Sequence, residues 1–386
     1  MRAAGRVPLA WLNLTHDLGR SVWSLLGVAF AVFLMFVQTG FDNGIYDSLA
    51  LLVTRLHADL FVVNRARFDV TPARPFPRDR LQQARGIDGV AAAYPVYVRP
   101  DGQWRTSVDG QPYEVRVVAY DPDQPVWADP AVNLLSRRLR KPETCLVDSL
   151  SHGPHGALRG GEWGELQGHR VQVVGSLALG TDLVYSGTLF LSLANYEAYL
   201  SRAGRTAPRI DQVELGLVQL EPGADREEIA RRLRAHLPDD VDVYAKDEMV
   251  DRIRVFWQRN QPIGQLFLIG TVIGFLIGVM VCYQVLFTEI LDQLPQYATL
   301  RAIGYGDRFL LATVLRQSLY LGGGAYAVGA LGAALAQQLL RRITGFEMAL
   351  TPGQALLVLA LTLAMCALAG RIAVRAALEA DPAEVF

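Results

Sequence analysis

Four long stretches without a charged side chain constrain this chain more than any other feature. Residues 21–41, 260–288, 317–340 and 348–370 contain no Asp, Glu, Lys or Arg. A helix needs about 20 mainly apolar residues, at about 1.5 Å rise each, to cross the hydrocarbon core of a bilayer. Between residues 42 and 262 the longest uncharged run, 183–196, is too short for that. The pattern predicts four membrane helices with a large insertion between the first two. Four buried helices of a soluble core are the weaker alternative, because such helices rarely lack charge for so long.

Composition agrees with a membrane protein that carries a sizeable folded insertion. Charged residues make up 19% of the chain, against about 25% in ordinary soluble domains, and the mean hydropathy is +0.20. The net charge of −1 excludes a strongly basic surface, so we expect no nucleic-acid partner. Three cysteines, Cys145, Cys282 and Cys366, are too few for a disulfide framework.

Basic residues near the first helix predict the orientation in the membrane. Arg2, Arg6 and Arg20 precede it, which favours a cytoplasmic N-terminus. Arg341 and Arg342 disagree, because they would then lie outside after the third helix. The first helix is too long and begins too late for a cleaved signal peptide, so we expect it to remain as an anchor. We therefore predict a multi-pass protein of a bacterial inner membrane with both termini in the cytoplasm.

The predicted segments follow the chain in a simple order. Membrane helices are expected at 21–41, 263–288, 309–340 and 353–371. The parts expected in the cytoplasm are an N-terminal segment at 1–20, a loop at 289–308 and a tail at 372–386. Residues 42–262 form the insertion, which this orientation places in the periplasm.

The insertion has a mixed pattern that predicts an α+β domain. Short β-rich runs predict strands at 58–63, 93–99, 114–119, 144–148, 170–176, 189–192, 212–220 and 241–244. Helices are predicted at 78–84 and 226–237, the second with Asp225 as its N-cap.

Apolar stripes with helical spacing stand at both ends of the insertion. The first comprises Ile45, Leu49, Leu52, Val53 and Leu56; the second comprises Met249, Ile253, Phe256 and Trp257. Both adjoin a membrane helix, and an apolar stripe needs a partner to bury against. We predict that the two helices pack on each other as a stalk for the domain. Two unrelated surface helices are the alternative.

Motifs for catalysis or for cofactor binding are missing from the sequence. It contains no G-x-x-x-x-G-K-[ST], no G-x-S-x-G, no H-E-x-x-H and no zinc spacing of Cys and His. The close pair His152 and His155 lies in a Gly/Pro-rich loop, where a solvated role is more common than metal binding. Apart from Arg316, near the start of the third span, no predicted span carries an ionisable residue in its interior that could relay a proton or an ion. We expect a chain that is not an enzyme and binds no cofactor or metal itself.

Glycines recur on one face of the second predicted membrane helix. Gly270, Gly274 and Gly278 form a G-x-x-x-G-x-x-x-G ladder, which permits close helix–helix approach. The ladder predicts packing within a bundle or across a dimer, although glycine is also common in membrane helices generally.

The loop between the second and third membrane helices contains a short apolar helix. Pro295 suits its start and Gly304 its end, so the helix is predicted at 296–303. Glu289 precedes it, and its own candidate contact residues are Tyr297, Ala298, Leu300, Arg301 and Ile303. Such a helix should dock either on a partner protein or on the membrane surface.

Several short motifs, spread from end to end, give the chain a family resemblance. They read PLAWL at 8–12, HADL at 57–60, YDPDQP at 120–125, VQLEPGAD at 218–225, YATLRAIGY at 297–305 and ADPAEVF at 380–386. With the order of one helix, a large outside domain and three helices, they resemble permeases of the FtsX/MacB/LolC type, and most closely the DevC family of ABC exporter permeases. MacB carries a fused ATPase domain, whereas this chain has no nucleotide motif.

The resemblance implies a division of labour between subunits. Two copies of the permease would pair, and a separate ATPase dimer, which binds ATP and Mg²⁺, would contact the loop helix and Glu289. The stalk would carry the motion to a MacB-like periplasmic core domain. The cargo, a glycolipid or another envelope substrate, would pass to a membrane fusion protein and a TolC-like outer-membrane channel.

Two other functions remain open at this point. An FtsX-like regulator would use the same helices and loop to switch a cell-wall enzyme without transporting anything. A membrane-tethered enzyme is the weaker alternative, because the insertion lacks a nucleophile–base motif.

Overall fold

The structure, a computed structural model, describes residues 18–66, 74–106, 110–151, 160–180, 185, 187–202, 210–260, 263–292, 307–344 and 350–379. Internal contacts divide the chain into two units. The first comprises Met1–Asn43, Pro262–Leu340 and Met348–Phe386, and the second comprises Gly44–Gln261 and Arg341–Glu347.

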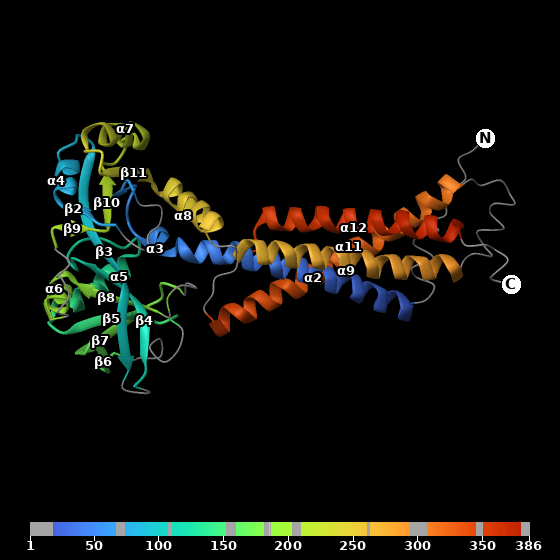
Figure 1. Cartoon of the computed structure of the whole chain (residues 1–386), viewed down its shortest axis with the longest axis horizontal. Helices are drawn as coiled ribbons and strands as arrows, with labels where there is room; N and C mark the ends of the chain where they lie inside the picture. Colours follow the sequence, from blue (N-terminus) through green and yellow to red (C-terminus); the bar gives the residue numbers. More distant parts are fainter. Residues whose placement is uncertain are drawn as a thin grey trace. The chain divides into compact units, whose positions relative to one another are not determined.

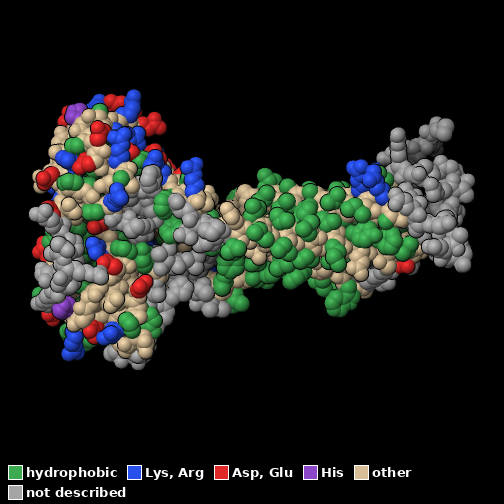
Figure 2. Space-filling model, in the orientation of Figure 1, with side chains coloured by type: hydrophobic (Ala, Val, Ile, Leu, Met, Phe, Trp, Pro, Cys, Tyr) green, Lys and Arg blue, Asp and Glu red, His purple; other side chains and the backbone are tan. Residues whose placement is uncertain are grey.

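Long apolar helices make up the first unit (Figure 1). They are α2 (Leu18–Leu49), whose last turns belong to the second unit, α9 (Ile263–Asp292), α11 (Asp307–Thr344) and α12 (Pro352–Glu379). Among the described residues four helices are long and apolar enough to cross a membrane, which confirms the predicted architecture. Hydrophobic side chains cover their visible surface in Figure 2, as expected where lipid replaces water.

A mixed sheet forms the second unit. Its strand order is β11-β1-β10-β3-β4-β8-β5-β7-β6, and β6 also pairs with β3. The six strands β3, β4, β8, β5, β7 and β6 therefore close into a ring, while β10, β1 and β11 extend from it as an open sheet. The strands in chain order are β1 (Leu60–Asn64), β3 (Val90–Thr106), β4 (Pro112–Tyr120), β5 (Thr144–Asp148), β6 (Trp163–Leu166), β7 (His169–Leu177), β8 (Thr188–Ser192), β10 (Leu215–Leu220) and β11 (Val241–Ala245).

Two of the neighbouring strand pairs in this sheet are parallel. These are β4 with β8 and β5 with β7, and the other neighbours run antiparallel. A separate two-stranded pair joins β2 (Phe76–Pro77) to β9 (Gln212–Val213).

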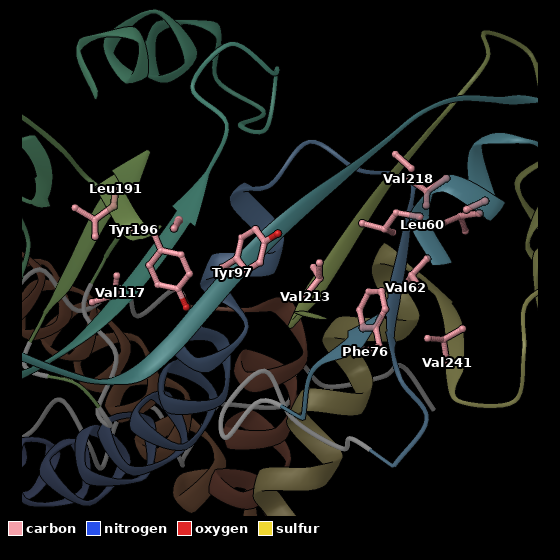
Figure 3. Close-up of a cluster of buried hydrophobic side chains, with 14 of the residues drawn as sticks. Leu60, Val62, Phe76, Tyr97, Val117, Leu191, Tyr196, Val213, Val218 and Val241 are labelled. Carbon is pink, nitrogen blue, oxygen red and sulfur yellow. The ribbon is translucent and has the colours of Figure 1, made fainter. Parts of the chain in front are cut away.

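Strand periodicity divides the buried residues between the two faces of the sheet. Along β1, Leu60 and Val62 belong to one core whereas Phe61 and Val63 belong to the other, as the two-residue repeat of a strand requires. Figure 3 shows the first core, here called the distal core, around Phe76, Tyr97 and Tyr196. Helices α4 (Asp79–Arg85) and α7 (Arg226–His236) contribute to it through Leu81 and Leu233.

The other face carries what we call the stalk core. Its buried members are Ala50, Leu52, Val53, Leu56, Ala58, Phe61, Val63, Val96, Val98, Val118, Tyr120, Val126, Trp127, Leu139, Leu146, Leu177, Leu179, Phe190, Leu215, Leu217, Tyr244, Met249 and Ile253. Two helices reach it, α3 (Leu51–Arg55) and α8 (Lys246–Asn260).

All of the predicted strands and both predicted helices of the insertion are present, with bounds that shift by three residues or fewer, except that β3 extends seven residues beyond its predicted end at residue 99. The structure adds β2, β6, α5 (Pro130–Ser136), a short 3₁₀ helix at Arg137–Arg140 and α6 (Leu193–Arg202). The run predicted as one strand at 212–220 is divided into β9 and β10.

Candidate functional site

The two apolar stripes at the ends of the insertion meet in the stalk core. Leu52 and Leu56 come from α3 and its C-cap, and Met249 and Ile253 come from α8; all four are buried. Leu49 packs against this core while only partly buried, whereas Ile45 and Phe256 are not among its members. Helices α3 and α8 are in contact, but most of the core is contributed by the sheet. The stripes therefore bury against the sheet as well as against each other.

The first stripe also differs from a single continuous helix. Helix α2 ends at Leu49, Ala50 forms a turn, and α3 begins at Leu51. The residues of the stripe thus lie on two consecutive helices.

Polar contacts join α8 to the first stripe. The Lys246 Nζ donates a hydrogen bond of 2.8 Å to the carbonyl of Leu56 at the end of α3. Arg254 of α8 forms an ion pair with Asp47 of α2. Both of these charged side chains are about two-fifths exposed, so the pair itself adds little stability. The two contacts set the register of α8 beside the first stripe.

The glycine ladder of α9 packs inside the first unit. A Cβ atom on Gly270 would lie 2.6 Å from Gln38 of α2, and one on Gly278 would lie 3.0 Å from the Ala31 Cβ and 2.1 Å from the Met365 Sδ. Gly274 faces Met35 at ordinary contact distance. The ladder thus lets α9 approach α2 and α12 within one chain.

Glycines of α11 act in the same way. A Cβ on Gly329 would lie 2.8 Å from the backbone oxygen of Ala29, and one on Gly322 would lie 2.6 Å from the Cys366 Sγ. Small residues therefore give α11 close contacts with both α2 and α12.

Glu289 has a partner within the helix bundle. Gln317 of α11 donates a hydrogen bond to its carboxylate, and Gln317 is buried at 3% exposure. This contact links the end of α9 to α11, the two helices that flank the loop at 293–306. Glu289 was predicted from the sequence as a coupling residue, whereas Gln317 was not. A single glutamine in an apolar run belongs to no recognisable motif.

The predicted loop helix at 296–303 lies outside the described residues. The same is true of Tyr297, Ala298, Leu300, Arg301 and Ile303. Their role at an ATPase contact remains a prediction.

The histidines, cysteines and carboxylates of the insertion are the groups that could form a metal site or supply a reactive thiol. No group of three or more His, Cys, Asp or Glu that could hold a metal ion occurs among the described residues, and His152 and His155 fall outside them. Cys145 is fully buried and burial raises its pKa, which makes its thiol unreactive.

A buried carboxylate on β5 was not anticipated. Asp148 is 1% exposed and accepts backbone hydrogen bonds from Leu150, Leu179 and Gly180. Burial raises its pKa to about 6, although these bonds and the charge of Arg116 oppose that shift. Two of its three bonds, those from Leu179 and Gly180, hold a loop that enters the stalk core through Leu179.

Comparisons with known proteins were made by structure and by sequence. Two solved structures are similar to this chain over about half of its length. The periplasmic region of MacB from Actinobacillus actinomycetemcomitans is 9% identical, with 50% of this chain and 91% of that chain covered and a TM-score of 0.34. The extracellular domain of the noncanonic ABC-type transporter YknZ from Gram-positive bacteria is 14% identical, with 48% and 98% covered and a TM-score of 0.31. These TM-scores are too low to add to the argument.

Sequence comparison is more decisive for the membrane helices. No curated protein sequence matches the chain. A family model does match, the FtsX-like permease C-terminal model, over residues 266–382. That range contains most of α9, all of α11 and all of α12. Residues 266–382 of this chain are therefore similar to the C-terminal domain of FtsX-like permeases.

Proposed function

We propose that the chain is the membrane subunit of an ABC-type export system in which a separate ATPase subunit hydrolyses ATP. The observation that carries this proposal is the match of residues 266–382 to the FtsX-like permease family. The sequence contains no phosphate-binding G-x-x-x-x-G-K-[ST] motif, so the nucleotide would bind to the partner.

The described helices suggest where force would enter. The loop at 293–306 connects α9 to α11, and the Glu289–Gln317 hydrogen bond joins these helices beside it. A partner that pulls or pushes on the loop would act on both helices together, because a shift of one helix alone would strain this part-buried hydrogen bond. Leu300, Arg301 and their neighbours are the residues proposed to contact the ATPase.

In this proposal, the stalk helices pass the motion on to the insertion. The last turns of α2 belong to the second unit. Side chains of α3 and α8 are part of the stalk core, where they pack with side chains of the sheet. Movement of these helices would shift side chains packed on the sheet, since a close-packed core transmits displacement rather than absorbing it. In this mechanism cargo need not pass through the helix bundle itself.

The orientation, cargo and further partners belong to the same proposal. The termini would lie in the cytoplasm and residues 42–262 in the periplasm, with the four spans in the inner membrane. The permease would act as a homodimer of the DevC type with a membrane fusion protein and a TolC-like channel. The cargo would be a lipid, in particular a glycolipid, or another envelope substrate.

The test is reconstitution with the ABC ATPase subunit that co-purifies with this chain. Nanodiscs containing both proteins should hydrolyse ATP faster when envelope lipid extract and the fusion protein are added, and the lipid that co-purifies can be identified by mass spectrometry. A catalytically inactive ATPase variant is the control. Failure of the two proteins to associate would refute the proposal, and association that instead activates a cell-wall hydrolase without moving lipid would favour the FtsX-like regulator.

A further inference from the structure

The loop after β7 lies between Asp148 and the stalk. Strand β7 ends at Leu177, whose pairing with Asp148 is the last contact between β5 and β7. Leu179, at 1% exposure, lies in the stalk core with Leu52 and Leu56 of the first stripe. Residues 178–180 therefore run from the end of the sheet to the side of the stalk.

One buried carboxylate fixes this loop. The Asp148 Oδ1 accepts hydrogen bonds from the Leu179 and Leu150 amides at 3.0 and 3.1 Å, and its Oδ2 accepts from the Gly180 amide at 3.2 Å. A cavity of about 290 Å³ adjoins the same loop and is lined by Thr54, Arg55, Trp127 and Leu177–Leu179 among others. The hydrogen bonds to Asp148 therefore restrain the backbone of the loop, while Leu179 packs in the stalk core.

Gly180, at the other end of the loop, lies close to α3 of the stalk. Gly180 is buried with a φ of +121°, and a Cβ atom there would lie 2.2 Å from the Cδ2 of Leu51, the first residue of α3. Only glycine takes this conformation without strain and leaves room for Leu51. The backbone of the loop thus touches the stalk helix directly.

We infer that Asp148 and residues 178–180 form a strut that ties α3 of the stalk to the end of β5, so that movement of the stalk reaches the closed ring of strands through this loop. Asp148 is a positioning residue in this scheme, since it acts on α3 only through Leu179 and Gly180. The strut deepens the proposed function by naming the path through which the stalk would act on the domain, and its effect on transport rests on that proposal.

The test begins with Asp148→Asn in the full-length permease in nanodiscs, followed by hydrogen–deuterium exchange. Asparagine keeps the volume of the side chain, but its NH₂ group confronts backbone N–H donors that now meet a carboxylate oxygen. Amide hydrogen exchange should accelerate at least tenfold at residues 179–180 and at least tenfold at residues 51–56. The matched control is Val173→Ala, a buried β7 residue of the distal core, which should leave exchange at 51–56 within twofold of the wild-type rate.

The result at the stalk decides the inference. If exchange at 51–56 stays at the wild-type rate in Asp148→Asn, the loop does not support the stalk and the inference is wrong. If Asp148→Asn does not fold, Gly180→Ala gives the second measurement, since it keeps the carboxylate and crowds Leu51. Gly180→Ala should accelerate exchange at 51–56, and an unchanged rate there would equally overturn the strut.

A transport measurement separates the strut from the proposed function. With its ATPase, Asp148→Asn should export at least fivefold more slowly than the wild type while retaining ATPase binding, and Val173→Ala should not. Wild-type rates of export in Asp148→Asn would overturn the mechanical role of the strut. If the wild-type permease exports nothing, the proposed function fails, and the exchange rates still decide whether the strut exists.

Discussion

Truncation of Leu52 on α3 and of Ile253 on α8 tests whether the two stripes of the stalk hold each other. Both side chains are buried in the stalk core, with 1% and 0% exposure. Truncation of a buried Leu or Ile to Ala costs about 2–5 kcal/mol of unfolding free energy, from lost transfer energy and the cavity left behind. A domain of typical stability, about 5–15 kcal/mol, should therefore survive either single substitution.

A double-mutant cycle gives the interaction between the two side chains. If they pack together, Leu52→Ala and Ile253→Ala should be non-additive by about 0.5–3 kcal/mol, because the first cavity already removes part of what the second substitution would lose. Guanidinium unfolding of the full-length chain, followed by tryptophan fluorescence, measures each free energy, and Trp127 reports from within the same core.

Leu81→Ala provides the control for this cycle. Leu81 is equally buried but lies in the distal core on α4, so its combination with Leu52→Ala should be additive within about 0.5 kcal/mol. Both single stalk variants should still bind the ATPase and should export more slowly. Additivity of Leu52→Ala with Ile253→Ala, as complete as in the control pair, would refute the reasoning that the stripes pack on each other.

Four further measurements test other parts of the molecule. Reporter fusions at residue 150 should read outside and those at residues 306 and 386 should read cytoplasmic, and a cytoplasmic reading at 150 would reverse the proposed topology. Leu300→Asp should cost on the order of 2–5 kcal/mol of ATPase association in a pull-down, with Gln293→Ala as the control; normal binding would place the contact elsewhere. Gly278→Ala should lower the melting temperature because of its contacts with Ala31 and Met365, whereas Gly323→Ala, with open space at its Cβ, should not; equal effects would argue against the packing role of the ladder. The pKa of Asp148 is raised to about 6 in the folded chain, so folding takes up a proton as the pH falls from 7 to 4. Relative to Asp148→Asn, the wild type should gain up to about 3 kcal/mol of stability over this range; denaturant titrations at both pH values would contradict this if the difference stayed constant.

Hydrophobic runs and local strand patterns carried most of the fold prediction. The four spans follow from length and lack of charge alone, and β5 begins and ends at the predicted residues, 144 and 148. Helix α5 was missed although Asp129 caps it and Pro130 opens it, a combination that is typical of a helix start. The sequence therefore does contain the start signal for this helix.

Other features depend on contacts that no local pattern contains. Strand β3 runs through Pro95, Pro100 and Gly102, which predict breaks, but pairing with β10, β4 and β6 keeps it extended, with a register shift between Arg99 and Gly102. Asp148 looks like any polar residue at a strand end, and its partners Leu179 and Gly180 lie about 30 residues further along the chain. Such a site becomes visible only when the sheet brings β5 and β7 together.

Strand β3 also has a consequence for how the domain folds and is degraded. Its first half pairs with β10 of the open sheet, and its second half pairs with β4 and β6 of the ring. Because β3 belongs to both halves, opening of one half would expose unpaired backbone groups along the strand that the other half still holds. Partial opening of one half is therefore energetically costly. We therefore expect a single cooperative transition for the insertion, with the slowest-exchanging amides of both halves sharing one opening free energy and with proteases cutting the sheet only after global unfolding.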